Sequence, residues 1–386
     1  MVEVFRTNNS DYFREIKRRH PEVRTIFFNS SFSVVAPYLV KDYYGSVVSN
    51  CTFYEPVVSK TEKCLSRFDD MVERRPMSTV LEQEIATRYS ETGTFIRVMT
   101  NAIVLSDGDV VKDNFKVVPI RCQMWGNEPY ESFRQEHEPY SHHREVFTIT
   151  QFWGHGFFHF VVEDLPRIAV YLPFLHRHPE VKVHVAVTNR FTVAYLEEVG
   201  IARSRLVSGH VAAGVLYMPG GTRCGRARLF STQLLSLRLR AGLAEPKPPR
   251  NVVILIKRTK KRWFNHHTDI LAMIRRHAGP AGLQTVVYGD NRVPGIEASR
   301  HLFDRAHMIV APHGAGLANM IFSRPGTFVV EGMFYRNRKP NWCFRSLAHV
   351  LGHRYYGQLG KQCMDVTASD IEPVVKYAVG RFKRTS

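Results

Sequence analysis

The chain has 386 residues, of which 44% are hydrophobic and 23% are charged. These fractions are typical of an ordinary soluble protein and do not favour disorder, and the length favours two domains or one large one. The 53 Lys and Arg against 35 Asp and Glu give a formal net charge of +18. That charge favours acidic partners such as nucleotide phosphates, nucleic acid, anionic glycans or a membrane surface.

The sequence contains no apolar run of the roughly 18 residues that a membrane-spanning helix needs. Residues 1–20 also lack the apolar core of a signal peptide. We therefore expect no membrane segment and a cytoplasmic protein of bacterial or viral type, whereas a chain trimmed from a larger one would suit the Golgi or endoplasmic reticulum lumen. Because the cysteines show no CxxC pair and no metal-ligand spacing, we expect buried free thiols, with disulfides as the alternative. The cysteines are Cys51, Cys64, Cys122, Cys224, Cys343 and Cys363.

The N-terminal quarter of the chain carries few informative patterns. Residues 1–20 predict a basic amphipathic helix, residues 25–28 predict a short strand, and residues 32–91 have a mixed pattern. We expect this segment to form an edge of the first domain.

An alternation of apolar and polar residues over 95–118 predicts a β-hairpin, with Asp107-Gly108 at its turn. Asp107 and Asp109 also form a DxD triplet, a pattern that holds a divalent metal and a nucleotide diphosphate in some transferases. Turn chemistry alone accounts for both residue types, so the turn is the favoured interpretation. The polar segment 121–145 that follows predicts a loop. We expect its histidines, His137, His142 and His143, to be exposed, with a metal cluster as the alternative.

The segment from Gln151 to Leu175 combines a helical apolar pattern with several polar residues. A loop is predicted at residues 153–156, and helical spacing begins at Phe157, with Pro166 expected to break or kink the helix.

Three polar residues in this predicted helix are candidates for chemistry. His159 and Glu163 lie four residues apart and hence on one helical face, and Asp164 lies one step further round. One of the three would act as a general base at the mouth of a cleft. The alternative is structural, with Glu163 and Asp164 pairing with Arg167 and capping the helix.

Strands and helices alternate from here onward, which predicts parallel sheets covered by helices. Strands are expected at residues 181–187, 205–207 and 215–218, and helices at residues 191–199 and 231–243.

The proline cluster at residues 245–250 is the predicted domain boundary. Residues 251–256 then form the continuous apolar run of a buried parallel strand, and the basic residues 257–262 follow its carboxyl end. Since ligands bind at that edge of doubly wound sheets, the basic run suggests phosphate binding, with a solvated loop as the alternative. A helix at 270–276, a strand at 285–288 and a helix at 296–305 complete the pattern of a Rossmann-like domain.

The stretch from Met308 to Glu331 predicts a strand, a glycine-bearing turn, a helix beginning near Gly316 and a second strand. A helix N-terminus without bulky side chains favours an anion such as a diphosphate. His313 could add a hydrogen bond or a charge, and Glu331 could accept hydrogen bonds from a ribose. A purely structural turn with a buried histidine is the alternative.

Three segments give the sequence a resemblance to glycosyltransferase family 61, whose members include O-linked N-acetylglucosaminyltransferases and plant xylosyl- and arabinosyltransferases. They are APHGAGLANMIFSRPGTFVVE at 311–331, VVILIKRTKKRWFN at 252–265 and FWGHGFFHFVVEDLPRI at 152–168. The resemblance covers residues 95–365, and the first segment is the most specific of the three.

The resemblance implies an α/β fold with GT-B architecture, in which two Rossmann-like domains face each other across a cleft. It also implies inverting transfer from a nucleotide sugar without a metal or other cofactor. UDP is the expected nucleotide, the sugar would be xylose, N-acetylglucosamine or arabinose, and the acceptor would be a hydroxyl of a glycan or glycoprotein. Two domains are expected: an acceptor-side domain at residues 95–245 and a donor-side domain at residues 246–375. Residues 1–94 would be a lineage-specific part of the acceptor-side domain. The C-terminal tail, residues 376–386, would pack back on that same domain.

The resemblance assigns donor-binding residues as well. The donor diphosphate would meet the turn and helix start formed by His313, Gly314, Ala315, Gly316 and Leu317. Asn319 would support this turn and Glu331 would bind the ribose. Arg258 and Arg262 would neutralise the departing diphosphate.

In the first domain, His159 and Asp164 match the polar positions of the family's motif. The chain departs from the family at Lys257, where serine is common, and at residues 153–156, where an extended loop of another sequence is common. An inverting displacement needs one base for the acceptor hydroxyl and positive groups for the leaving diphosphate. We expect Asp164 to be that base, with Glu163 and His159 as the competing candidates.

Two other functions are compatible with parts of the sequence. A nucleic-acid-binding protein would use the charge of +18, but aromatic residues are not interleaved with the basic run and no nucleic-acid module is recognisable. A catalytically inactive relative that binds glycans or scaffolds another protein would keep the fold and lose the poised base. The sequence does not determine the oligomeric state.

Overall fold

The computed structural model describes residues 24–27, 95–112, 115–117, 139–169, 171–222, 224–241, 243, 247–291, 293–336, 339–360 and 365–382. The predicted helix at 1–20, the mixed segment 32–91, most of the loop at 121–145 with His137, and four of the cysteines lie outside these residues. The described residues form two compact units, residues up to Leu235 in unit 1 and residues from Ser236 in unit 2. None of the described helices has both the length and the apolar character required to cross a membrane.

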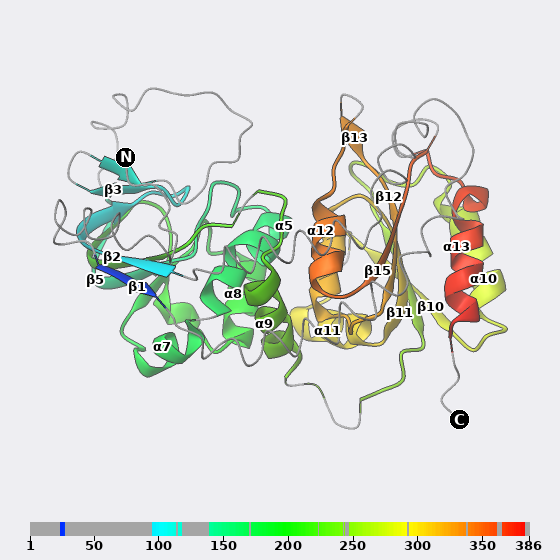
Figure 1. Ribbon diagram of the computed structural model, residues 1–386, viewed down its shortest axis with the longest axis horizontal. Coiled ribbons are helices and arrows are strands. Elements are labelled where there is room, and N and C mark those ends of the chain that lie inside the picture. Colours follow the sequence, from blue (N-terminus) through cyan, green and yellow to red (C-terminus); the bar gives the residue numbers. More distant parts are fainter. Residues whose placement is uncertain are drawn as a thin grey trace. The chain divides into compact units, whose positions relative to one another are not determined.

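Unit 1 is built on a mixed sheet with the strand order β4-β3-β2-β8-β5-β6-β7, and β1 pairs with β2 (Figure 1). Its strands are β1 Arg24–Phe27, β2 Phe95–Val104, β3 Val110–Lys112, β4 Phe115–Val117, β5 Ser141–Thr148, β6 Lys182–His184, β7 Leu206–Val207 and β8 Val211–Pro219. The pairs β8–β5, β5–β6 and β6–β7 are parallel, whereas β1, β3 and β8 pair antiparallel with β2. The predicted β-hairpin is confirmed as β2–β3.

The helices of unit 1 follow the predicted alternation with strands. They are α7 Leu172–Arg177, α8 Arg190–Glu198 and α9 Leu229–Arg240, with a short 3-10 turn, η5, at Arg203–Arg205. The side chain of Asn189 accepts a hydrogen bond from the Thr192 amide and so caps α8. The division between the two units falls within α9, ahead of the predicted boundary at the proline cluster.

The helix predicted from Phe157 changes its winding partway along. It consists of α5 Phe157–His159, the π-helical turn η4 Phe160–Asp164 and α6 Pro166–Ala169. The Leu165 amide donates to the Phe160 carbonyl, five residues back, at 2.7 Å. Pro166 has no N–H and cannot continue the α-helical ladder, so the predicted disruption takes the form of a π-turn just before the proline.

Unit 2 has a five-stranded, all-parallel sheet with the order β10-β9-β11-β12-β15. Its strands are β9 Val252–Lys257, β10 Gln284–Gly289, β11 Ala306–Pro312, β12 Phe328–Gly332 and β15 Arg354–Gln358, and β13 Tyr335–Arg336 pairs with β14 Lys339–Pro340. Its helices are α10 His267–Ala278, α11 Ile296–Asp304, the 3-10 helix η6 Ala315–Phe322, α12 Cys343–Val350 and α13 Ala368–Gly380. In Figure 1, α10 and α13 cover one face of this sheet, and α11 and α12 cover the other.

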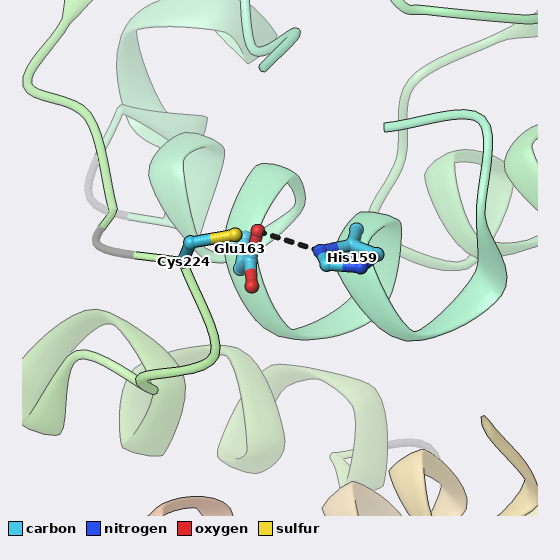
Figure 2. A group of neighbouring side chains, drawn as sticks. All are labelled: His159, Glu163 and Cys224. Carbon is cyan, nitrogen blue, oxygen red and sulfur yellow. Dashed lines mark hydrogen bonds and ion pairs between the residues drawn. The ribbon is translucent and has the colours of Figure 1, made fainter. Parts of the chain in front are cut away.

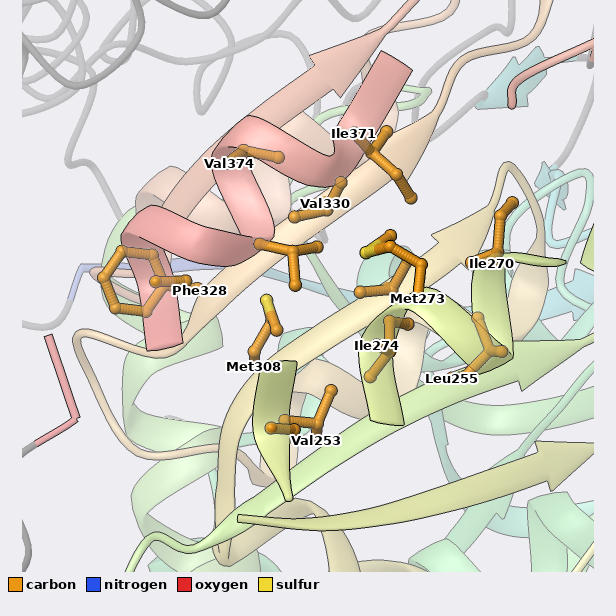
Figure 3. Packing of buried hydrophobic residues seen from close by; sticks show 14 of the residues in the cluster. Val253, Leu255, Ile270, Met273, Ile274, Met308, Phe328, Val330, Ile371 and Val374 are labelled. Atoms are coloured by element: carbon orange, nitrogen blue, oxygen red, sulfur yellow. The ribbon is translucent and has the colours of Figure 1, made fainter. Parts of the chain in front are cut away.

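The core of unit 2 forms where alternate residues of the central strands face α10 and α13, as Figure 3 shows. The strands contribute Val253, Leu255, Met308, Val310, Phe328 and Val330, and the two helices contribute Ile270, Met273, Ile274, Ile371, Val374 and Val375. The strands are apolar on both faces because helices bury both. Tyr377, Val379 and Phe382 pack against the same core. The described part of the C-terminal tail therefore packs on the core of unit 2.

The strand order of unit 2 determines where its ligand site should lie. From β9 the chain goes outward to β10 on one side, and then returns to β11 on the other side of β9. In open parallel sheets, ligands bind beyond the carboxyl ends of the strands at such a reversal of direction. In unit 2 this position lies beyond β9 and β11, where the predicted Arg258 and His313 follow their strands.

Candidate functional site

Arg258 and the turn after β11 meet at the carboxyl edge of the unit 2 sheet. The Arg258 Nη1 donates to the carbonyl oxygen of His313 at 2.8 Å. Gly314 lies directly under this guanidinium, so a Cβ at that position would overlap Nη1. Burial and the neighbouring Arg262 both lower the pKa of Arg258, and Asp290 opposes them. Two of the predicted donor-binding segments therefore come together at the strand reversal.

The turn leads into η6, whose first two residues are partly exposed. The Leu317 amide donates to the Gly314 carbonyl at 3.0 Å, so the amides of Ala315 and Gly316 precede the first donor inside the helix. Both residues are partly exposed, while Leu317 is fully buried and packs below them. Asn319 donates to the Gly316 carbonyl at 3.0 Å and holds the turn.

The helix predicted at this position is present, but it winds as a 3-10 helix. Every residue from Leu317 to Phe322 is buried, whereas the sequence pattern indicated one buried face of an α-helix. Packing on all sides, not helix propensity, sets the tighter winding.

His313 and Glu331 form a buried hydrogen-bonded pair in unit 2. His313 Nδ1 lies 2.5 Å from Glu331 Oε1, and the Tyr355 hydroxyl donates to Glu331 Oε2 at 2.6 Å. Burial, together with the Glu331 carboxylate, raises the pKa of Tyr355 well above its usual range. Glu331 has no exposed surface and both of its oxygens are engaged, so the geometry does not support our expectation that it binds a ribose. It holds the ring of His313 instead.

Arg262 reaches the same region through an unusual backbone conformation. Its φ is +56°, in the left-handed region that non-glycine residues rarely adopt. Its guanidinium carbon lies 5.1 Å from the centre of the Phe334 ring, and that ring lies 5.7 Å from the His313 ring. The Phe334 ring therefore lies against both Arg262, which is predicted to bind the donor diphosphate, and His313 of the predicted turn. Phe334 and Tyr355 belong to no recognisable sequence motif, so the sequence did not predict that either residue would lie here.

In unit 1, His159 and Glu163 form a hydrogen-bonded dyad on the helix that contains the π-turn. His159 Nδ1 lies 2.9 Å from Glu163 Oε2, as Figure 2 shows. The Gly225 amide donates to Glu163 Oε1 at 2.6 Å. The side chain of His159 is 30% exposed, whereas that of Glu163 is 1% exposed. Glu163 is thus a buried orienting group, and His159 presents the rest of its ring to the surface.

Asp164, the predicted base, lies in a different environment. It is 1% exposed, and no side chain among the described residues donates a hydrogen bond to its carboxylate, which has only the backbone of Gln151 as a weak partner. The Gly154 Cα packs so closely on it that a Cβ there would overlap Oδ2. Burial raises the pKa of Asp164 well above its usual value, against the attraction of Arg167 and with the repulsion of Glu163. Because Asp164 is buried whereas His159 is partly exposed, the geometry favours His159 over Asp164 as the base.

Arg167 does not form the ion pairs of our structural alternative. Its guanidinium donates to the carbonyls of Ile149 and Thr150 at 2.8 Å each, of Pro219 at 2.6 Å and of Gly220 at 3.2 Å. The carbonyls of Ile149 and Thr150 come directly after β5, and those of Pro219 and Gly220 lie at the end of β8. Burial lowers the pKa of Arg167 to about 10. Arg167 therefore connects the ends of two strands, and it leaves Glu163 to His159 and Gly225.

The described residues bring one trio of potential metal ligands together. Atoms of His159, Glu163 and Cys224 lie within 4.8 Å of one another (Figure 2). Cys224 is disulfide-bonded, so it offers no thiolate, and this trio lacks the donor set that a three-ligand transition-metal site needs. For Cys224 the expectation of a free thiol is wrong, whereas Cys343 is a buried free thiol as predicted.

The DxD triplet forms the turn that the sequence favoured. Asp107 Oδ1 accepts a hydrogen bond from the Asp109 amide at 3.0 Å, and Gly108 has φ +89° and packs against the Thr150 carbonyl. Turn chemistry thus explains Asp107 and Gly108. His142 and His143 lie on β5, not in a loop.

The structure is that of an α/β protein with two groups of candidate site residues. In unit 2, Arg258 lies against the turn after β11. In unit 1, His159 and Glu163 form a hydrogen-bonded dyad. The family model described as Glycosyltransferase 61 matches residues 157–330. The match supports glycosyltransferase family 61 and, with it, a glycosyltransferase that has donor and acceptor substrates. The matched region begins at α5 and ends just before Glu331, so it includes every other predicted site residue.

Comparisons with whole proteins add little. No curated protein matches the chain. Among solved structures, a mutant flavo di-iron protein from Thermotoga maritima is similar to this chain, at 12% identity and a TM-score of 0.26. The alignment covers 56% of this chain and 49% of that protein, so this chain spans about half of its length.

Proposed function

We propose that the chain is an inverting glycosyltransferase that moves a sugar from a UDP-sugar to a hydroxyl of a glycan or glycoprotein. The contact of Arg258 with the turn after β11 is the observation that carries the proposal. It places a guanidinium against the turn that leads into Ala315 and Gly316, at the position where parallel sheets bind phosphates. Xylose, N-acetylglucosamine and arabinose are the candidate sugars.

The donor diphosphate would bind to the edge formed by Arg258, Arg262, Ala315 and Gly316. Guanidinium groups and oriented amides stabilise the negative charge that develops on a leaving diphosphate. This is the role that a divalent metal has in other transferases, so the proposed reaction is independent of metal. His313, held by Glu331, would fix the turn that presents the amides.

His159 would be the base. Its Nδ1–H is directed at Glu163, which leaves Nε2 as the acceptor for the hydroxyl proton. In the proposed step, that proton moves to Nε2 while the acceptor oxygen bonds to the anomeric carbon. The bond from this carbon to the diphosphate oxygen breaks, and its electron pair leaves on the diphosphate. The anomeric configuration inverts because the displacement is a single one.

GT-B architecture is part of the proposal. Each unit contains a run of parallel strands, and unit 2 has the complete doubly wound order. We propose that unit 1 is the acceptor-side domain and unit 2 the nucleotide-sugar domain, and that they face each other across a cleft.

Calorimetric titration with UDP and a panel of UDP-sugars tests the donor half. Arg258→Ala should weaken the affinity for UDP by at least about tenfold, because it removes a charge-assisted contact to the diphosphate. Arg276→Ala is the matched control, since Arg276 pairs with Glu372 on α10 and α13, and it should bind UDP like the wild type. A wild-type chain that binds none of these nucleotides would contradict the proposed function.

Turnover tests the base. His159→Ala should lower kcat by about 10² to 10⁴, the range of general-base contributions, without changing the affinity for UDP. Equal turnover of wild type and His159→Ala would remove His159 from the mechanism.

A further inference from the structure

Unit 1 carries a row of rings next to the dyad, on the loop between β5 and α5. We call Phe152, Trp153 and His155 the aromatic loop. Phe152 is 43% exposed and Trp153 is partly exposed. The Phe152 and Trp153 rings meet edge to face with centres 4.8 Å apart, and the centres of Trp153 and His155 are 5.8 Å apart. The loop thus presents contiguous aromatic surface to solvent.

The aromatic loop is rigidly anchored. The buried side chain of Gln151 pairs with the backbone of Thr222, through the Gln151 Nε2 to the Thr222 carbonyl at 3.1 Å and the Thr222 amide to Oε1 at 2.5 Å. The Gly154 amide donates to the Gln151 carbonyl and the Gly156 amide to the Trp153 carbonyl, at 2.8 and 2.9 Å. Gly154 packs on Asp164 below. The backbone of the loop is therefore held in place before any ligand arrives, which reduces the entropic cost of binding.

The position of the rings connects them to the chemistry. The centres of the Trp153 and His159 rings are 6.2 Å apart, with a tilt of 35° between the ring planes. A ligand stacked on Trp153 would therefore have its edge near the partly exposed ring of His159. A suitable ligand for such a surface is apolar on one face and carries hydroxyls at its rim, because two apolar rings lie beside two imidazoles.

We infer that Phe152 and Trp153 form a binding platform for a pyranose ring of a saccharide acceptor, with His155 and His159 at the rim to meet its hydroxyls. The pyranose would stack on the Trp153 ring, and the Phe152 ring, which lies at 86° to it, would contact the edge of the sugar. The C–H face of a pyranose matches an aromatic ring, and its equatorial hydroxyls match the two imidazoles. The inference rests on the proposed function, because it makes the platform the acceptor subsite of the same enzyme. It also specifies the acceptor as a sugar and not the hydroxyl of an unmodified peptide.

Binding of short saccharides to the full chain tests the platform separately from donor binding. Saturation-transfer NMR with chitobiose, xylobiose, cellobiose and lactose, with UDP present, should detect at least one of them. Phe152→Ala and Trp153→Leu should each weaken that binding by about tenfold and leave the calorimetric affinity for UDP unchanged. Tyr140→Ala is the matched control, because Tyr140 is a 77% exposed ring of unit 1 that stacks on His210, away from the dyad.

The outcomes separate the inference from the proposed function. Saccharide binding that both loop variants retain, or binding of a Ser/Thr peptide without any saccharide, would overturn the platform while UDP binding still supports the enzyme. Failure to bind UDP would instead count against the proposed function.

Discussion

Arg258 occupies the space above Gly314 that any larger residue would need, and its Nη1 donates to the His313 carbonyl at 2.8 Å. The turn and the arginine therefore depend on each other, although 55 positions separate Arg258 from His313. A change as small as one methyl group at residue 314 should disturb the cationic edge of unit 2.

Gly314→Ala should displace Arg258 and weaken the affinity for UDP by about tenfold, because the added Cβ overlaps the guanidinium. Calorimetry measures the affinity. Gly380→Ala is the control, since nothing lies within 4 Å of a Cβ at that position. Wild-type affinity in Gly314→Ala would show that Arg258 does not bind the diphosphate from this position.

Phe334→Leu should weaken the affinity for UDP about fivefold, because it removes the ring over which Arg262 lies. Titration of the purified variant with UDP provides the measurement. Tyr377→Leu is the control, because it removes a comparable ring of α13 over which Arg381 lies. This variant should leave UDP binding unchanged. If both variants lose affinity equally, the loss comes from general destabilisation and not from Arg262.

Asp164→Asn should stabilise the protein near neutral pH and keep turnover close to that of the wild type. Burial raises the pKa of Asp164 well above 3.8, so the folded state keeps a proton that the unfolded chain releases. The free energy of unfolding therefore falls as pH rises from 3.8 towards the folded pKa. Asparagine resembles the protonated form and removes this loss, which should raise Tm by a few degrees near neutral pH and less in acid.

Thermal scans at several pH values check this expectation, with Asp304→Asn as the contrast. Asp304 is buried and pairs with Arg324 at 2.8 Å, so its loss should lower Tm near neutral pH. A large drop in turnover in Asp164→Asn, with UDP affinity intact, would restore Asp164 as the base.

Cys224 and Cys343 should differ in their reaction with an alkylating reagent. In denaturant, Cys343 should react at once because it is a free thiol, whereas Cys224 should react only after reduction because it is disulfide-bonded. Mass spectrometry of the digested protein locates the label. Reduction should also destabilise the fold by about 2 to 4 kcal/mol. Labelling of Cys224 without reductant would mean that the disulfide is absent from the isolated protein.

Local patterns in the sequence were sufficient for much of unit 2. The apolar run of β9, the alternation of strands and helices, and the glycines after β11 predicted where Arg258 and His313 would lie. These features depend on neighbours in the chain. The tighter winding of η6 could not be predicted, because it depends on side chains packed from several elements.

The roles of the polar residues in unit 1 were harder to predict. Helical spacing placed His159, Glu163 and Asp164 close together, but it does not show which carboxylate is buried without a side-chain partner. That distinction depends on Gly154 packing over Asp164 and on the Gly225 amide, which lies 62 positions from Glu163. The contacts of Phe334 and Tyr355 likewise depend on the tertiary fold.

The guanidinium of Arg167 has a consequence for how unit 1 opens. It donates hydrogen bonds both to the carbonyls that follow β5 and to the carbonyls at the end of β8. If the Arg167 side chain moved away, each of these carbonyls would have to accept a hydrogen bond from water instead. The segment that leads to the aromatic loop and the segment that leads to Cys224 should therefore be released in one event. In a hydrogen-exchange experiment, the amides around Gly154 and Gly225 should exchange as one cooperative unit. An opening that disorders the aromatic loop would therefore also break the hydrogen bond from the Gly225 amide to Glu163.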